Sequence, residues 1–306
     1  MSATPPEPEV PSGSPGLEHG TVHLPDVDLH YVRQGRGPSI VLLHGWPEFW
    51  RVWRKILEPL SANFSVIAPD LRGFGASSKP DLPALDGYRV EDHVADLQGL
   101  ADALGLGRFG VVSHDVGAYV TQAFARAHPE RLTGLFFFDC PYPGIGRRWA
   151  DPEHLREIWY QSFHRLPMAA ELVGSSRAAC EIYFRHFLDH WAHAPDVFEK
   201  EDIDAWVDNF LEPGNLQGGF NWYVASAPGR IELIRHGPPD LPPIEIPTRV
   251  RWGADDSILN VEWADALDRY FSDCDFAPVE GAGHFVAYER PDLAIAEITD
   301  FFTGRE

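Results

Sequence analysis

Short apolar runs alternate with longer helical patterns along most of this chain. The apolar runs are rich in β-branched residues and lie at 30–33, 40–43, 65–68, 110–113, 132–138, 248–252 and 275–278. Between them, apolar residues recur at helical spacing near 50–60, 90–104, 118–127, 261–270 and 291–302. Strands that alternate with helices are typical of a parallel sheet covered by helices, so the pattern predicts an α/β fold.

The alternation breaks once, after Asp139. Residues 141–230 carry helical periodicity with many aromatic side chains, for example at 155–163, 178–190 and 200–211. The proline-rich stretch 238–247 then leads to the next strand, because neighbouring prolines favour an extended connector. We therefore predict a disordered leader over 1–16, a core built from 17–140 and 231–306, and a helical cap over 141–230.

The charge balance excludes several classes of partner. With 25 Lys and Arg against 46 Asp and Glu, the net charge of −21 opposes binding to nucleic acid or to an anionic membrane surface. Three cysteines without CxxC spacing indicate neither a disulfide framework nor a zinc site. The N-terminus does not resemble a signal peptide, and no apolar run is long enough to span a membrane, so we expect a cytoplasmic protein.

The segment 110–118, GVVSHDVGA, runs from an apolar strand directly into a helix. Ser113 and Gly117 lie two positions before and after Asp115, where a strained turn between strand and helix has no room for bulky side chains. This spacing predicts a nucleophile elbow with an acid in place of serine. A carboxylate nucleophile suits displacement at a strained or activated sp³ carbon and leaves an alkyl ester. The competing interpretation is that Asp115 only caps the helix, since Asp is a favoured N-cap residue.

Four motifs together give the chain a resemblance to a known family. They are HGWPE at 44–48, DLRGFGAS at 70–77, SHDVG at 113–117 and GAGHF at 281–285. Residues 40–139 and 248–291 resemble the α/β-hydrolase superfamily, in its aspartate-nucleophile branch of epoxide hydrolases and haloalkane or haloacetate dehalogenases. The resemblance implies a mostly parallel eight-stranded sheet flanked by helices, with an inserted helical cap, and a reaction that needs neither cofactor nor metal.

The resemblance also implies the other members of a charge relay. His284, in a Gly-rich turn, becomes the general base, and Asp256, three residues after Gly253, becomes the acid that orients it. Asp255 is then a solvated neighbour, although the sequence leaves the order of these two acids open. Asp139 is the position that some relatives use instead.

Residues of the cap distinguish an epoxide from a halide as the leaving group. An epoxide oxygen leaves as a tethered alkoxide that needs hydrogen-bond donors, and the resemblance implies Tyr160 and Tyr223 for that task. It also implies that the backbone amides of Trp46 and Val116 form an oxyanion hole. Dehalogenases commonly have an indole after the nucleophile, and haloacetate enzymes have arginines close behind it, whereas this chain has Val116 and Tyr119 there. The residues expected to line the substrate pocket are Trp46, Gln161, Trp159, Trp222 and Phe285.

These observations predict an epoxide hydrolase that forms a covalent ester on Asp115 and hydrolyses it to release a vicinal diol. A dehalogenase with the same nucleophile is the alternative, and a non-catalytic ligand-binding protein on the same fold is a further one. The expected partners are a small-molecule epoxide and water, and a homodimer is left open.

Overall fold

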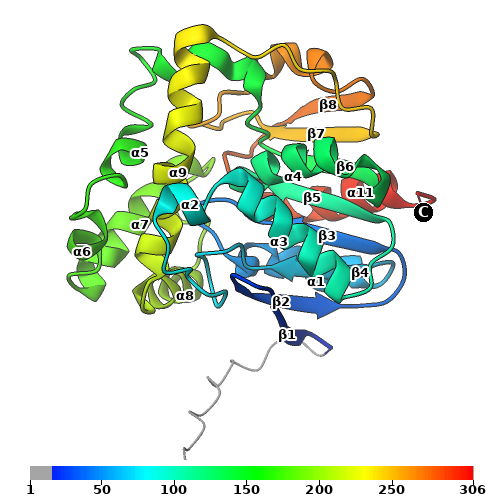
Figure 1. The fold of residues 1–306 in the computed structure, drawn as a ribbon, viewed down its shortest axis with the longest axis horizontal. Coiled ribbons are helices and arrows are strands. Elements are labelled where there is room, and N and C mark those ends of the chain that lie inside the picture. Colours follow the sequence, from blue (N-terminus) through cyan, green and yellow to red (C-terminus); the bar gives the residue numbers. More distant parts are fainter. Residues whose placement is uncertain (1–15, 306) are drawn as a thin grey trace, which may run out of the picture.

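An eight-stranded mixed sheet forms the centre of the computed structural model, which describes residues 16–305 (Figure 1). The strands are β1 (Glu18–His23), β2 (Asp28–Gln34), β3 (Ser39–Leu43), β4 (Ser65–Pro69), β5 (Phe109–His114), β6 (Leu132–Phe138), β7 (Thr248–Gly253) and β8 (Cys274–Val279). Their spatial order is β1-β2-β4-β3-β5-β6-β7-β8. Strand β2 is antiparallel to both of its neighbours, and the other pairs are parallel. The predicted mostly parallel eight-stranded sheet is confirmed.

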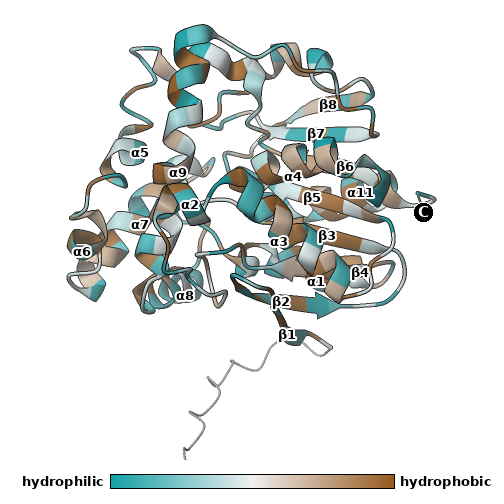
Figure 2. Cartoon of the chain, in the orientation of Figure 1, coloured by the Kyte–Doolittle hydropathy of each residue, from teal (hydrophilic) through white to brown (hydrophobic). Residues whose placement is uncertain are grey.

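Four helices cover the sheet. Helix α1 (Arg54–Ser61) packs beside α11 (Pro291–Phe302) on one face, and α3 (Val90–Ala103) packs beside α4 (Val116–Ala127) on the other (Figure 1). Glycines in the central strands let α11 approach closely, because a Cβ on Gly110 would lie 2.3 Å from the Phe302 ring and one on Gly134 2.9 Å from the Phe301 ring. Figure 2 shows apolar residues concentrated in β3 and β5, which lie at the centre of this packing.

The helical cap lies over the carboxyl ends of the parallel strands, on the left of Figure 1. It follows the short helix η3 (Pro143–Ala150) and contains α5 (Trp159–Phe163), α6 (Ala169–Val173), α7 (Arg177–Trp191), α8 (Lys200–Leu211) and α9 (Asn215–His236). Arg54 of the core donates from Nε and Nη2 to the Asp202 carboxylate of α8, at 2.8 and 2.6 Å. The indole of Trp206, also on α8, donates to the Pro47 carbonyl at 2.7 Å. These bonds attach one side of the cap to the core.

Several elements differ from the sequence-based prediction. The helix expected over 50–60 is divided into η1 (Trp50–Trp53) and α1, and the one expected over 155–163 begins only at Trp159. Helix α9 continues to His236, so the predicted cap boundary after residue 230 falls inside this helix. The predicted leader over 1–16 lies, except for Gly16, outside the described residues. The remaining short helices are α2 (Ala84–Gly87), η2 (Pro129–Arg131), η4 (Val261–Arg269) and α10 (Val286–Glu289).

The α-helix expected over 261–270 is the 3₁₀ element η4, which is broken at Ala266. The hydroxyl of Tyr142 causes the break, since it donates to the Trp263 carbonyl at 2.6 Å and accepts from the Ala266 amide at 3.1 Å. The Tyr142 hydroxyl thus replaces a hydrogen bond that the backbone of η4 would otherwise make within the helix. No helix within residues 16–305 is both long and apolar enough to cross a membrane.

Candidate active site

Asp115 occupies the turn between β5 and α4 in a strained backbone conformation. Its φ of 45° and ψ of −109° lie in a region that residues other than glycine rarely adopt. The surrounding chain leaves little room, because a Cβ on Gly45 would lie 2.6 Å from Cβ of Asp115 and one on Gly117 would lie 2.4 Å from the Leu43 carbonyl oxygen. The Asp115 side chain makes no capping hydrogen bond to α4, which contradicts the interpretation that it only caps this helix.

A backbone amide binds the Asp115 carboxylate. Oδ1 accepts a hydrogen bond from the Trp46 amide at 2.9 Å. The Gly117 amide donates to the His44 carbonyl at 3.1 Å, which ties the start of α4 to the loop that carries Trp46. Val116 is the first residue of α4, where amide groups lack partners within the helix and the helix dipole favours an anion.

His284 lies in the loop between β8 and α10, and only one of its two ring nitrogens has a hydrogen-bond partner among the described residues. Its Nδ1 lies 2.8 Å from Oδ2 of Asp256, and both side chains are buried. The other carboxylate oxygen of Asp256 accepts from the amides of Ile258 and Leu259 at 2.8 and 2.9 Å. Nε2 of His284 is buried and has no hydrogen-bond partner among the described residues. A histidine held in this way can accept a proton at Nε2, as a general base must.

The two other acids considered for this position have different partners. Asp255 lies at the surface, where its Oδ2 is 2.8 Å from Nδ1 of His193. Asp139 is buried, and its Oδ1 accepts from the Gly253 amide at 2.7 Å. Of the three acids, Asp256 is therefore the one hydrogen-bonded to His284.

A second buried imidazole, which the sequence analysis missed, lies against the first. The ring centroids of His114 and His284 are 4.5 Å apart, and Nδ1 of His114 is 2.9 Å from Oε2 of Glu48. Burial opposes the charged ring, but the charge and hydrogen bond of Glu48 outweigh it and raise the pKa of His114. His114, Asp139 and His284 offer possible metal-ligand atoms within 4.8 Å of one another. A raised pKa makes the His114 ring a poorer metal ligand, because a cation must displace the proton from it.

The cap brings two tyrosines together above Trp46. Tyr160, from α5, stacks on the Trp46 ring with a centroid distance of 5.0 Å, and Tyr223, from α9, meets that ring edge-on at 5.6 Å. The two phenol rings are 5.3 Å apart and buried. Burial and then the charge of Asp115 raise the pKa of Tyr160, and burial, Tyr160 and Asp115 raise the pKa of Tyr223. Both hydroxyls therefore remain protonated at neutral pH and can donate hydrogen bonds.

The residues predicted to line the substrate pocket divide into two groups. Trp46, Trp222 and Phe285 are buried, and Nε2 of Gln161 donates to the Tyr160 hydroxyl at 3.2 Å. Trp159, also predicted to line the pocket, is 40% exposed, and its place in the pocket stays a prediction. Successive residues of a helix point about 100° apart, so Trp159 turns outward where the next residue turns inward.

Three aromatic residues that the sequence analysis did not select close the site. The ring of Trp191 lies 5.1 Å from that of His284, whose amide donates to the Trp191 carbonyl at 2.8 Å. Phe187 and His164 contact the Trp46 ring at 4.8 and 4.7 Å. The helical periodicity of 178–190 predicts a buried face of α7, but it does not identify the part of the core that this face covers.

Known proteins resemble this chain over nearly its whole length. Residues 38–291 match the model of the family described as the alpha/beta hydrolase fold. The soluble epoxide hydrolase of Corynebacterium sp. (strain C12) is 31% identical, with 94% of this chain and 97% of that protein covered. Epoxide hydrolase 2 of Siraitia grosvenorii is 39% identical, with 93% and 98% covered. The solved structure of the epoxide hydrolase CorEH without ligand superposes with a TM-score of 0.82 at 29% identity, covering 94% of this chain and 99% of that one.

Proposed function

Because this chain belongs to the α/β-hydrolase fold family and is an epoxide hydrolase within it, we propose that it opens its substrate through a covalent ester on Asp115. A carboxylate oxygen of Asp115 bonds to an epoxide carbon, and the ring C–O bond breaks. Tyr160 and Tyr223 donate hydrogen bonds to the ring oxygen, and one of the two hydroxyls transfers its proton to this oxygen. The ring oxygen becomes a hydroxyl, and the tyrosine that gave the proton becomes a phenolate. The product of this step is a β-hydroxyalkyl ester.

The observation that carries this proposal is the meeting of two buried tyrosines from separate cap helices. Their rings lie 5.3 Å apart, and both contact Trp46, whose amide binds the Asp115 carboxylate. Their raised pKa values favour neutral hydroxyls, which are the form that can donate to a developing alkoxide. A site that only displaced a leaving halide would need no such pair of proton donors.

The second step hydrolyses the ester. His284, oriented by Asp256, takes a proton from water at Nε2, and the water oxygen attacks the carbonyl carbon of Asp115. The amides of Trp46 and Val116 stabilise the oxyanion. When it collapses, the ester C–O bond breaks and the leaving diol oxygen takes the proton held by His284. The acid proton on Asp115 returns to the tyrosine phenolate, which restores the carboxylate and releases the vicinal diol. General-base help of this kind accelerates a reaction by about 10²–10⁴-fold.

A dehalogenase that uses the same nucleophile is the second candidate. The indole nitrogen of Trp46 is buried without a hydrogen-bond partner among the described residues, and such an N–H group could bind a halide. That nitrogen lies against α9, however, since a Cβ on Gly219 would be 3.7 Å from it. The paired tyrosines have no function in this alternative, so we favour the epoxide.

The variant His284→Gln tests the two-step scheme. Alkylation of Asp115 does not require the base, whereas hydrolysis does, so the variant should retain the ester and gain the mass of the epoxide. Intact-protein mass spectrometry after incubation with a panel of aryl and aliphatic epoxides measures this gain, and peptide mapping locates it. Diol formation by the wild-type protein is followed in parallel.

The same panel separates the candidates. Halogenated analogues are incubated with the wild-type protein, and halide release without diol formation from any epoxide would favour the dehalogenase. If the wild-type protein turns over an epoxide and His284→Gln carries no adduct, the covalent mechanism is refuted. Asp115→Asn is the matched control that should carry no adduct under any condition.

A further inference from the structure

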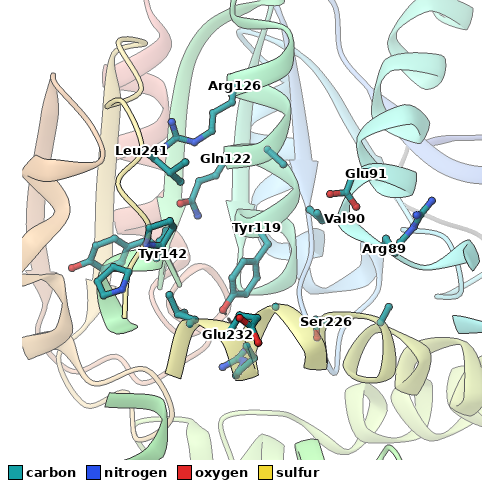
Figure 3. A pocket seen from close by; sticks show the side chains of 18 of the residues that line it. Arg89, Val90, Glu91, Tyr119, Gln122, Arg126, Tyr142, Ser226, Glu232 and Leu241 are labelled. Atoms are coloured by element: carbon teal, nitrogen blue, oxygen red, sulfur yellow. Dashed lines mark hydrogen bonds between the residues drawn. The ribbon is translucent and has the colours of Figure 1, made fainter. Parts of the chain in front are cut away.

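A cavity of about 770 Å³ lies between α4 and α9 (Figure 3), and Trp222, one of the residues predicted to line the substrate pocket, is part of its wall. In Figure 3, Tyr119 extends from α4 toward α9, and Gln122 and Arg126 follow it along the same helix. Apolar side chains, among them Val90 and Leu233, form much of the remaining wall. The volume is that of a site for a small organic molecule.

Arg230, on α9, is a half-buried cation in the wall of this cavity without an acidic partner. Its Nη2 donates to the Tyr119 hydroxyl at 3.2 Å, its guanidinium lies 3.8 Å from the centroid of the Trp149 ring, and its Nη1 is buried without a hydrogen-bond partner. Glu91 and Glu232 also line the cavity, but no ion pair within residues 16–305 includes Arg230. Buried charges in proteins are normally paired, and this chain has 46 acids for 25 Lys and Arg. An unpaired guanidinium is therefore a feature that needs an explanation.

Helices α4 and α9 place Arg230 in a fixed position relative to the proposed nucleophile, Asp115. Tyr119 follows Asp115 by one turn of α4. Arg230 follows Tyr223 by seven residues, which places both on the same face of α9 about 10 Å apart along its axis. A ligand that lies between the two helices would thus have one end near Asp115 and the other at Arg230.

We propose that Arg230 binds a carboxylate carried by the epoxide substrate, and that the cavity between α4 and α9 holds the apolar body that joins the two groups. This inference rests on the proposed epoxide hydrolysis and names its substrate class. Nη1 of Arg230 would gain the acceptor that it lacks, and the Tyr119 hydroxyl, which now accepts from Arg230, can donate to the same carboxylate. The strongly negative protein repels anions at long range, so recognition of a carboxylate requires a local cation of this kind.

The test compares an aliphatic epoxide that ends in a carboxylate with its methyl ester, at a pH where the acid is ionised. The two compounds have nearly the same apolar body, so the ratio of their kcat/KM values reports the charge alone. In the wild-type protein we expect the acid to be favoured about tenfold to a hundredfold. Arg230→Gln should reduce the ratio to near one, mainly through KM for the acid, and Arg230→Lys should restore part of it.

Arg235→Gln is the matched control. Arg235 lies on the same helix, is exposed, and is not part of the cavity wall. Its substitution should leave the ratio unchanged. Because the ratio is taken within each variant, a general loss of folded or active protein does not alter it.

Calorimetry with a saturated carboxylic acid of the same length examines the anion site without catalysis. The acid should bind the wild-type protein and compete with a neutral epoxide, and Arg230→Gln should lose the binding. A wild-type ratio near one, or a ratio that Arg230→Gln does not change, overturns the inference while turnover of neutral epoxides leaves the proposed function intact. Binding through Arg230 without competition would mean a separate ligand and also overturns it. The two proposals can fail independently. A protein that binds the acid through Arg230 but opens no epoxide contradicts the proposed function.

Discussion

Replacement of Asp256 by asparagine should slow hydrolysis of the ester without slowing alkylation of Asp115. The reason lies in the hydrogen bonds that Asp256 makes. The carboxylate Oδ1 accepts from the amides of Ile258 and Leu259, and Oδ2 faces Nδ1 of His284. An asparagine that turned its NH₂ group toward the two amides would leave two buried donors unpaired, at about 1–3 kcal/mol each. The opposite orientation keeps both bonds and turns the NH₂ group toward Nδ1.

That orientation forces the wrong tautomer on His284. Nδ1 must then accept a hydrogen bond, the ring proton moves to Nε2, and Nε2 can no longer take a proton from water. We expect steady-state turnover by Asp256→Asn to fall about 10⁴-fold, the loss that the equivalent tautomer error causes in a serine protease triad. Alkylation of Asp115 needs no base and should proceed close to the wild-type rate.

Rapid-quench single-turnover experiments with intact-mass detection measure both steps. The ester should form and then persist in Asp256→Asn. Asp255→Asn is the control, because Asp255 contacts His193 at the surface and should leave both rates unchanged. A larger loss in Asp255→Asn, or equal losses of alkylation and hydrolysis in Asp256→Asn, would refute the reasoning.

Two further predictions concern stability. Asp202→Asn should lower the free energy of unfolding by about 3 kcal/mol, because it breaks a buried charge pair with Arg54, and urea denaturation measures the loss. Burial opposes the charge of Asp202, but hydrogen bonds from Arg54 and Tyr288 outweigh it and lower the pKa of Asp202. The difference in unfolding free energy between the wild-type protein and Asp202→Asn should therefore be complete above the ordinary Asp pKa, and it should shrink as the pH falls through the lowered pKa of the folded protein. Asp139→Asn should stabilise the protein at neutral pH, because burial, and then the charge of Asp256, raises the pKa of Asp139. The folded wild-type protein loses stability as the pH rises from the ordinary Asp pKa toward this raised value, so the gap between the two melting temperatures should widen with pH; a gap that narrows would contradict the assignment.

The central strands could be predicted from the sequence because burial on both faces leaves a continuous apolar run. Strand β1 could not, since it is an edge strand whose six residues, EHGTVH, include one buried position. The break in η4 is a different case. Local periodicity favours a helix there, and the residue that interrupts it, Tyr142, lies 121 positions away from the carbonyl that it binds. A window along the sequence cannot contain such a contact.

The same distinction applies to the site. Asp115 stands out because the strain of its turn requires small neighbours within two residues, which a local motif records. The order of Asp255 and Asp256 depends on which carboxylate turns toward His284, and the distinction between Trp159 and Tyr160 depends on the rotation of α5 against the core. Both are properties of the packed molecule. The motif HGWPE contained Glu48, but its contact with His114 became evident only once the two segments were side by side.

Arg230 illustrates that the sequence does not reveal which groups a charged side chain contacts. In the sequence it is one charge among several on a long helix, and in an acidic chain a carboxylate partner would be the ordinary expectation. The structure gives it a tyrosine hydroxyl and an indole face instead. Because α9 carries both Tyr223 and Arg230 on one face, the same helix would set the distance between the donors at the epoxide and the cation at the carboxylate. A change in the length or tilt of α9 should therefore alter which epoxides are accepted, whereas the reaction at Asp115, positioned by β5 and the Trp46 loop, would stay the same.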